Sequence, residues 1–140
     1  MNKKSLIVGH GEVGQAIQHF FPEAGVIDLL RASPIEGPID IMHVCIPCKD
    51  QESFVKSVKA YQERFKPKYT VIHSTVPVGT CRKLNAISSP VLGVHPNLAG
   101  GIETFTKFLG GEQASEVADD FRFAGIKVYL FDKSETSELM

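Results

Sequence analysis

The sequence predicts an α/β fold with a mostly parallel sheet covered by helices on both faces. Three features predict it: strands of near-continuous Val, Ile and Leu, helical stripes between them, and a glycine-rich turn after the first strand. Continuous apolar strands are typical of parallel sheets buried on both faces. Strand–helix alternation is typical of right-handed crossovers within one sheet. With 140 residues, the chain has the size of one domain.

Six short apolar runs are the predicted strands. They are Ser5–Val8, Val26–Leu29, Ile41–Ile46, Thr70–His73, Val91–Val94 and Ile126–Phe131. Eleven residues, Leu30 to Asp40, separate the second strand from the third, too few for a helix, another strand and a second helix. We therefore expect a sheet trimmed by the loss of one outer strand. The strands should lie in the order 2-1-3-4-5, with the sixth at or near an edge.

Three helices are predicted from apolar residues at helical spacing, each followed by a stop signal. Their stripes are Val13, Ala16, Ile17 and Phe20 before Pro22; Phe54, Val58, Tyr61 and Phe65 before Pro67; and Ala114, Val117, Ala118 and Phe121 before Gly125. We expect the aromatic pairs Phe20–Phe21 and Phe121/Phe123 to pack these helices on the sheet. Any part of that surface left exposed would mark a dimer face or the seat of another domain.

The C-terminal residues predict one more helix. Asp132 and Glu135 have the spacing of a capping box, which opens a helix. We expect residues 1–132 to form a nucleotide-binding domain. Residues 133–140 should begin a helix that either docks on this domain or leads into a second domain outside this sequence.

The turn Gly9-His10-Gly11-Glu12-Val13-Gly14 matches the loop that binds dinucleotides in Rossmann-type domains. Gly9 permits the tight turn, Gly11 lets the backbone approach a pyrophosphate, and Gly14 allows close helix–strand packing. Asp28 ends the second strand, where a carboxylate accepts hydrogen bonds from a ribose and repels the 2′-phosphate of NADP. The unit therefore predicts NAD as cofactor, with Arg31 keeping NADP as an alternative. The other interpretation is a glycine-rich turn that binds nothing.

A second informative stretch, Ser74 to Thr80, follows the fourth predicted strand. Ligands of open α/β sheets lie beyond the carboxyl ends of the strands. Ser74 and Thr75 are therefore candidates to face a nicotinamide or a substrate. Helix capping is the alternative role for these hydroxyl groups.

The stretch Ser74-Thr75-Val76-Pro77-Val78-Gly79-Thr80 resembles the S-T-V-P-x-G-T signature of the UDP-glucose/GDP-mannose dehydrogenase family. The glycine loop, Asp28 and the strand end Val44-Cys45-Ile46-Pro47 are similar to the NAD-binding domain of that family, in the same order. Weaker similarity continues through His95-Pro96-Asn97-Leu98, Phe108-Leu109-Gly110-Gly111 and Glu135-Thr136-Ser137-Glu138-Leu139.

The resemblance implies NAD as cofactor and the oxidation of a nucleotide-sugar alcohol to a carboxylate. Thr75 is the one catalytic position of the family that matches this sequence. Asn97 stands where the family has a catalytic glutamate, and an amide cannot act as a general base. The lysine, asparagine and cysteine of the family's active site lie beyond the last helix, so we expect no complete active site in this chain alone. The cofactor-binding residues implied are Gly9, Gly11, Glu12, Val13, Gly14, Asp28, Cys45, Ile46, Pro47, Ser74 and Thr75.

Other functions fit parts of the sequence. Asn97 is consistent with a non-catalytic module that binds a nucleotide or takes part in assembly. His95-Pro96 is consistent with a prephenate-dehydrogenase-like enzyme. Cys45 and Cys48 form a C-x-x-C pair, but Cys45 lies inside a predicted buried strand, which favours an inert apolar thiol. Three histidines, His43, His73 and His95, match no known metal-ligand spacing, so we predict no metal site.

Composition narrows the partners. The net charge is −1 and no basic block occurs, which excludes an electrostatic nucleic-acid or membrane-surface partner. No apolar run approaches the ~20 residues of a membrane span. Three cysteines form no disulfide framework, which favours a cytoplasmic protein. The protein partners that remain are a second copy of this chain, in a homo-oligomer, or a separate second domain.

Overall fold

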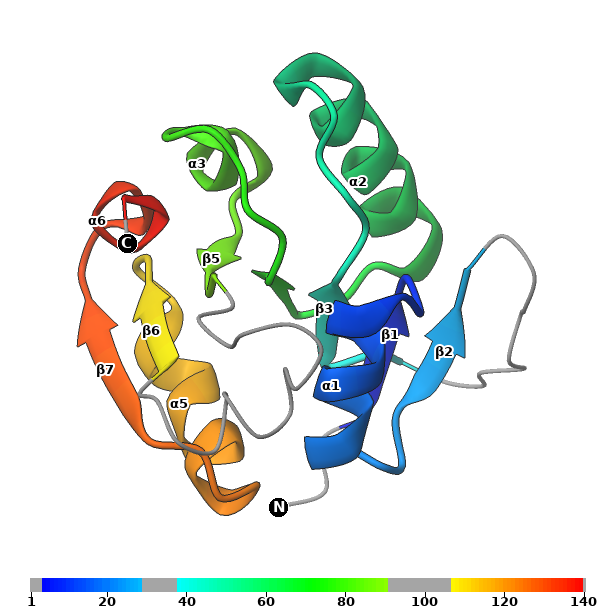
Figure 1. The fold of residues 1–140 in the computed structure, drawn as a ribbon, viewed down its shortest axis with the longest axis vertical. Coiled ribbons are helices and arrows are strands. Elements are labelled where there is room, and N and C mark those ends of the chain that lie inside the picture. The colour runs from blue at the N-terminus through cyan, green and yellow to red at the C-terminus, as the bar shows by residue number, and fades with distance from the viewer. Residues whose placement is uncertain (1–3, 29–37, 91–106, 140) are drawn as a thin grey trace.

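The computed structural model describes residues 4–28, 38–90 and 107–139, and these contain a seven-stranded sheet (Figure 1). The strand order is β2-β1-β3-β4-β5-β6-β7, and every pair is parallel except β5 with β6. The strands are β1 Ser5–Val8, β2 Gly25–Ile27, β3 Ile41–Val44, β4 Tyr69–Ile72, β5 Ile87–Ser88, β6 Lys107–Gly110 and β7 Val128–Phe131.

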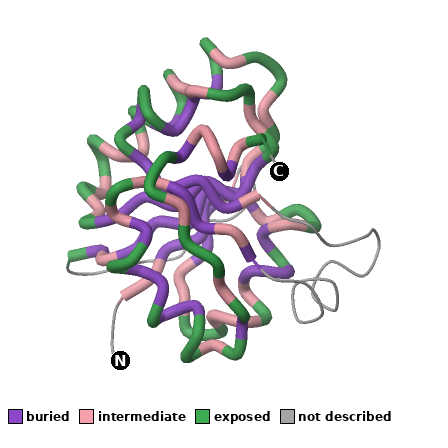
Figure 2. The backbone as a smooth tube through the Cα atoms, turned by 90° about the vertical axis from the view of Figure 1, so that its left-hand side faces the viewer, coloured by how far each residue is buried: buried purple, intermediate pink, exposed green. Residues whose placement is uncertain are grey.

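Helices cover both faces of this sheet. They are α1 Glu12–Phe20, α2 Gln51–Phe65, α3 Thr80–Leu84, α5 Ala114–Phe123 and α6 Ser134–Glu138. On one face, Ile17 of α1 and Phe121 of α5 pack in a buried core with Ile7 of β1. On the other face, Phe54 of α2 and Leu84 of α3 pack in a second core. Figure 2 shows the buried strands running through the centre of the molecule. The predicted doubly wound α/β fold is confirmed.

The predicted strand order is confirmed for the first four strands, and β2 lies at the edge of the described sheet. The sixth predicted strand is β7, which lies at the opposite edge as expected. The fifth strand of the sheet is Ile87–Ser88, whereas residues 91–94, where we expected it, lie outside the described residues. The strand β6 has no counterpart in the prediction. Both omissions have the same cause, because a two-residue strand and one that begins with lysine lack an apolar run.

The three predicted helices are confirmed, and each ends at its expected stop. Helix α1 ends at Phe20, two residues before Pro22. Helix α2 ends at Phe65, and Lys66 takes the left-handed conformation with φ of 46° before Pro67. Helix α5 ends at Phe123, and Gly125 follows with φ of +96°, which suits a residue without a side chain.

Two expectations about side chains are wrong. Lys133, not Asp132, is the N-cap residue of α6, and its side chain makes no hydrogen bond that caps the helix. Glu135 forms an ion pair with Arg82 of α3. Phe123 is 78% exposed and does not pack on the sheet, whereas Phe121 is fully buried. A cavity of about 580 Å³ is lined by Phe123 together with Phe20 and Phe21.

No helix within the described ranges is long and apolar enough to cross a membrane.

Candidate functional site

The register of the parallel strands brings the sequence-predicted residues to one edge of the sheet. Val8 pairs with Ile27 on one side and with Val44 on the other, and Val44 pairs with Ile72. The chain therefore leaves β1, β2, β3 and β4 at the same level. The glycine loop, Asp28, the Cys45–Pro47 segment and Ser74–Thr75 all begin at this edge.

Backbone hydrogen bonds continue between these segments beyond the strands. The Gly9 N–H donates to the Ile27 carbonyl over 2.7 Å, and the Cys45 N–H donates to the Val8 carbonyl over 2.8 Å. The His73 N–H donates to the Val44 carbonyl over 2.9 Å. The glycine loop is therefore fixed against the ends of both neighbouring strands.

Gly9 and Gly14 lie where a side chain does not fit. Gly9 has φ of +100°, and a Cβ there would lie 2.9 Å from the carbonyl carbon of Cys45. A Cβ on Gly14 would lie 1.9 Å from the Gly9 carbonyl oxygen. Helix α1 therefore starts in close contact with the turn, as a dinucleotide loop requires.

Gly11 has a different environment, because no atom of the described residues would lie within 4 Å of a Cβ at this position. It is exposed and is the N-cap residue of α1, with φ of −79° and no side-chain hydrogen bond to the helix. Helix α2, in contrast, is capped by Asp50, whose carboxylate accepts from the Ser53 N–H over 2.8 Å. Gly11 thus supplies no side-chain cap to α1, and the space beside it is open as far as the described residues go. Helix starts of this kind attract anions.

Glu12 and Val13 lie between Gly11 and Gly14. Glu12 is exposed, and Val13 is half-buried. Asp28 is half-buried and follows Ile27, the residue whose carbonyl accepts from the glycine loop. A carboxylate thus stands at the tip of β2, next along the sheet edge from Gly9.

The residues from β3 and β4 divide into buried and exposed members. Ser74 is buried, and its hydroxyl donates to the Ile46 carbonyl, which ties the ends of the two strands together. Thr75 and Pro47 are exposed, whereas Ile46 is half-buried. Thr75 is therefore the hydroxyl residue of this pair that a ligand could reach.

The C-x-x-C cysteines are free thiols in the structure. Cys45 is buried, and burial raises the pKa of its thiol to about 12, so it remains protonated at neutral pH. Burial, followed by the charge of Asp50, raises the pKa of Cys48 as well. Neither thiol has the lowered pKa that a reactive redox cysteine needs.

A buried polar cluster on the α1/α5 side of the sheet contains His43 and His73, which the sequence singled out, and Lys107, which it did not. The Nδ1 atom of His43 lies 2.9 Å from the Nε2 atom of His73. Lys107 is 2% exposed, and its Nζ donates to the carbonyls of Ser89 over 2.5 Å and Pro90 over 2.9 Å. No local pattern marks Lys107, because it becomes buried only through the pairing of β6 with β5.

Burial controls the charge of this cluster. Desolvation, followed by the charge of Lys107, lowers the pKa of His43 to about 3 and also lowers the pKa of His73 well below its ordinary value. Desolvation lowers the pKa of Lys107 to about 7. Within the described part of the chain, the His43 Nε2 and His73 Nδ1 atoms have no hydrogen-bond partner. No set of three or more metal-ligating side chains occurs there, and His95 lies outside it.

The two histidines predict a loss of stability in acid. Between pH 6.5 and about 3, His43 is neutral in the folded state but protonated in the unfolded chain. The unfolded state binds more protons, so the free energy of unfolding falls as the pH falls, by up to about 1.4 kcal/mol per pH unit for each histidine. The free energy of unfolding, measured with urea at several pH values between 5 and 6, should depend less steeply on pH in His43→Leu. We expect its slope against pH to be about 1.4 kcal/mol per pH unit smaller than in the unchanged chain. The exposed His19→Gln is the control, and an unaltered slope in His43→Leu would contradict the buried neutral state.

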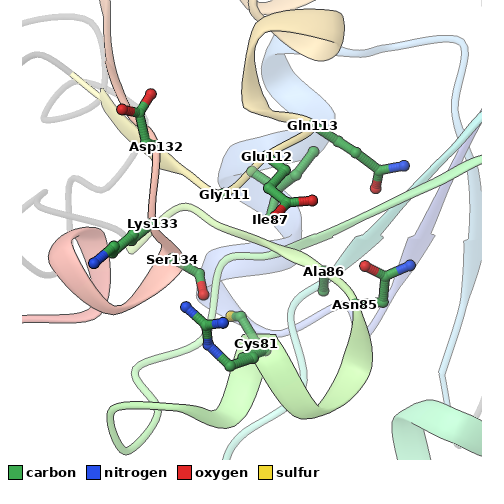
Figure 3. A pocket seen from close by; sticks show the side chains of 11 residues that line it. Cys81, Asn85, Ala86, Ile87, Gly111, Glu112, Gln113, Asp132, Lys133 and Ser134 are labelled. Atoms are coloured by element: carbon green, nitrogen blue, oxygen red, sulfur yellow. The ribbon is translucent and has the colours of Figure 1, made fainter.

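A cavity of about 420 Å³ lies away from the glycine loop, between α3, the start of β5 and the end of β6. Figure 3 shows Lys133 and Ser134 on one side of it and Asn85 on the other. Its charged lining residues are of both signs, Arg82, Lys133, Glu112 and Asp132. This lining gives no preference for an anion, and the cavity contains none of the sequence-predicted site residues.

No family model matches the sequence, and no curated protein matches it. Solved structures do resemble the fold. A reductive aminase from Aspergillus terreus, in complex with NADPH and ethyl levulinate, has 12% sequence identity and a TM-score of 0.68. A UDP-glucose dehydrogenase from the archaeon Pyrobaculum islandicum has 16% identity and a TM-score of 0.64. An imine reductase variant from Myxococcus stipitatus, in complex with NAD+, has 12% identity and a TM-score of 0.65.

Each of these alignments covers 99% of this chain. They cover 58% of the aminase, 48% of the UDP-glucose dehydrogenase and 58% of the imine reductase, so this chain spans about half the length of the proteins it resembles. The TM-scores of 0.64 to 0.68 show a shared fold, and at identities of 12–16% they show the fold alone. The chain therefore has the Rossmann-type α/β fold found within these dehydrogenases and reductases.

Proposed function

We propose that this chain is the NAD-binding domain of an oxidoreductase similar to the UDP-glucose/GDP-mannose dehydrogenases. The observation that carries the proposal is the open start of α1 at Gly11, fixed at the carboxyl edge of the sheet. Backbone N–H groups and the positive end of a helix stabilise phosphate without any side chain. The pyrophosphate of NAD would be held there by the loop Gly9–Gly14.

Two features support a dinucleotide over a simple anion. The aminase and the imine reductase with the same fold carry NADPH and NAD+, respectively. Asp28 at the tip of β2 provides a carboxylate that can accept hydrogen bonds from a ribose. The same carboxylate would repel the 2′-phosphate of NADP, which favours NAD.

The remaining site residues would line the second half of the cofactor. Cys45, Ile46 and Pro47 follow β3, and the exposed Thr75 follows β4. NAD held there would supply hydride-accepting chemistry, and the Thr75 hydroxyl would orient an alcohol substrate by a hydrogen bond. The S-T-V-P-x-G-T resemblance supports a nucleotide sugar as that substrate.

Replacing Asp28 tests both the cofactor and its selection. A charged hydrogen-bond acceptor is worth about 1.5–3 kcal/mol, so Asp28→Ala should weaken NAD binding by about 10-fold or more. NADP binding should weaken less, because the repulsion of its phosphate is also lost. Calorimetric titrations of both cofactors measure the effect, with the exposed Glu23→Ala as control. Folded protein that binds no NAD at millimolar concentration would overturn the proposed function.

A second candidate function is nucleotide binding without catalysis, as a sensing or assembly module. Asn97 favours it, because this amide stands where the resembling family has its general base. Turnover by this chain alone separates the two functions in one direction. Oxidation of a nucleotide sugar would exclude the binding module, whereas NAD binding without turnover is expected of both functions.

A further inference from the structure

The C-terminal helix α6 holds the loop that carries the Ser74–Thr80 signature. The Glu138 carboxylate accepts two backbone hydrogen bonds there, from the Gly79 N–H over 3.1 Å and the Cys81 N–H over 3.2 Å. Gly79 is the N-cap residue of α3 and has no side chain with which to cap that helix. A residue almost sixty positions further along the chain therefore supplies the cap.

Helix α6 is itself held firmly against the sheet. The Ser137 hydroxyl lies 3.1 Å from the carbonyl oxygens of Ser88 in β5 and Phe108 in β6 and donates to them. A Cβ on Gly110 would lie 2.6 Å from the Ser137 Cβ, so the backbone of β6 directly contacts the helix. Arg82 of α3 also pairs with Glu135. The contacts of Ser137 and Gly110 fix the position from which Glu138 reaches the loop, whereas the Arg82–Glu135 pair is largely exposed at Arg82 and contributes little.

The opposite end of the loop has its own anchor. The Ser74 hydroxyl donates to the Ile46 carbonyl at the end of β3. Near the Glu138 end, the Thr80 hydroxyl donates to the Pro77 carbonyl over 2.6 Å and accepts from Gln51 over 3.0 Å. The loop is thus tied at both ends and leaves Thr75 exposed between them.

We propose that Glu138 is a positioning residue for the nicotinamide side of the site. By holding the Gly79 and Cys81 amides, it sets where the loop presents Thr75 beside the strand ends. Without this carboxylate, two amides at the start of α3 lose their acceptor. Gly79, with φ of +95°, then regains the backbone freedom that glycine has in an unconstrained turn. The inference rests on the proposed NAD site.

The location of Glu138 predicts a selective effect on ligand binding. The adenosine half of NAD would contact the glycine loop and Asp28, which Glu138 does not touch. The nicotinamide half would lie toward Thr75. Loss of the Glu138 cap should therefore weaken binding of NAD but leave binding of ADP unchanged, whereas general destabilisation of the fold would weaken both.

The test is calorimetric titration of NAD and of ADP into three proteins, namely the unchanged chain, Glu138→Gln and Glu135→Gln. Glu138→Gln keeps the size of the side chain but turns one acceptor into a donor. We expect this variant to bind NAD about 5- to 10-fold more weakly and to keep its affinity for ADP within about twofold of the unchanged chain. Glu135→Gln removes a carboxylate from the same helix without uncapping α3, so both affinities should stay within about twofold. Equal losses for NAD and ADP in Glu138→Gln, or no loss for NAD, would overturn the role of Glu138.

A second measurement needs no ligand. Amide hydrogen exchange at Gly79 and Cys81 should be protected in the unchanged chain and about 10-fold faster in Glu138→Gln. Should that variant unfold, Glu138→Asp keeps the carboxylate on a shorter side chain and should give a smaller change of the same sign. Unprotected amides in the unchanged chain would contradict the cap itself. Absence of both NAD and ADP binding, with both amides protected, would overturn the proposed function and with it this role of Glu138.

Discussion

Gly11→Asp is expected to abolish NAD binding without destabilising the fold. Gly11 is the exposed N-cap residue of α1, and its φ of −79° suits any residue. Aspartate is a preferred N-cap residue, so the free energy of unfolding should stay the same or rise by a few tenths of a kcal/mol. The new carboxylate would occupy the place proposed for the pyrophosphate and repel it. We expect affinity to fall at least about 100-fold, which corresponds to about 2.8 kcal/mol.

Gln113→Asp is the matched control for this variant. Gln113 is the N-cap residue of α5 and also lacks a side-chain hydrogen bond to its helix, so the substitution adds the same charge at an equivalent position. It lines the cavity near Gly111 and lies away from the glycine loop. NAD affinity should be unchanged in Gln113→Asp. An equal loss in both variants would indicate a general effect of charge and would count against a phosphate site at α1.

Gly14→Ala is expected to destabilise the whole domain. A Cβ at this position would lie 1.9 Å from the Gly9 carbonyl oxygen, so α1 and the turn would have to separate. Overpacking of this kind costs about 1–3 kcal/mol or more. Alanine has a helix propensity about 1 kcal/mol better than glycine, which offsets part of that cost. We expect a net loss of about 2 kcal/mol, measured from urea unfolding curves.

Gly11→Ala separates the steric effect from the general effect of losing a glycine. A Cβ on Gly11 would contact no atom within 4 Å in the described part of the chain, so this substitution should cost at most about 1 kcal/mol through a poorer N-cap. If both alanine variants lost the same stability, the contact between α1 and the turn at Gly9 would not be as close as the structure indicates.

The parts of the fold that follow from local patterns could be predicted from the sequence. Parallel strands such as Ile41–Val44 are buried on both faces, so their apolar runs identify them. Pro22, Pro67 and Gly125 act on their own neighbours, and the helix ends occur as they predict. In contrast, Ile87–Ser88 is a strand only because longer strands place it in the sheet.

The same distinction applies to the candidate site. The glycine loop is one continuous segment, and Asp28 follows the adjacent strand. Their spacing in the sequence was therefore enough to predict that they lie at the same edge of the sheet. The contacts of Glu138 with Gly79 and of Lys107 with Ser89 join residues far apart in sequence. The capping-box prediction failed because the N-cap position is Lys133, one residue after Asp132, and Glu135 pairs with Arg82 of another helix. A pattern of spacing carries no information about a partner from a distant helix.

The most direct test of the NAD site is a titration of the ¹⁵N-labelled chain with NAD, followed through its backbone amide resonances. The proposed site predicts the largest shifts at the amides of Gly11, Glu12 and Val13, with a smaller shift at Asp28. The amide resonances of Gly111 and Lys133, beside the distant cavity, should not shift. Shifts confined to those two residues, or no shift anywhere at millimolar NAD, would contradict a phosphate-binding role for the start of α1.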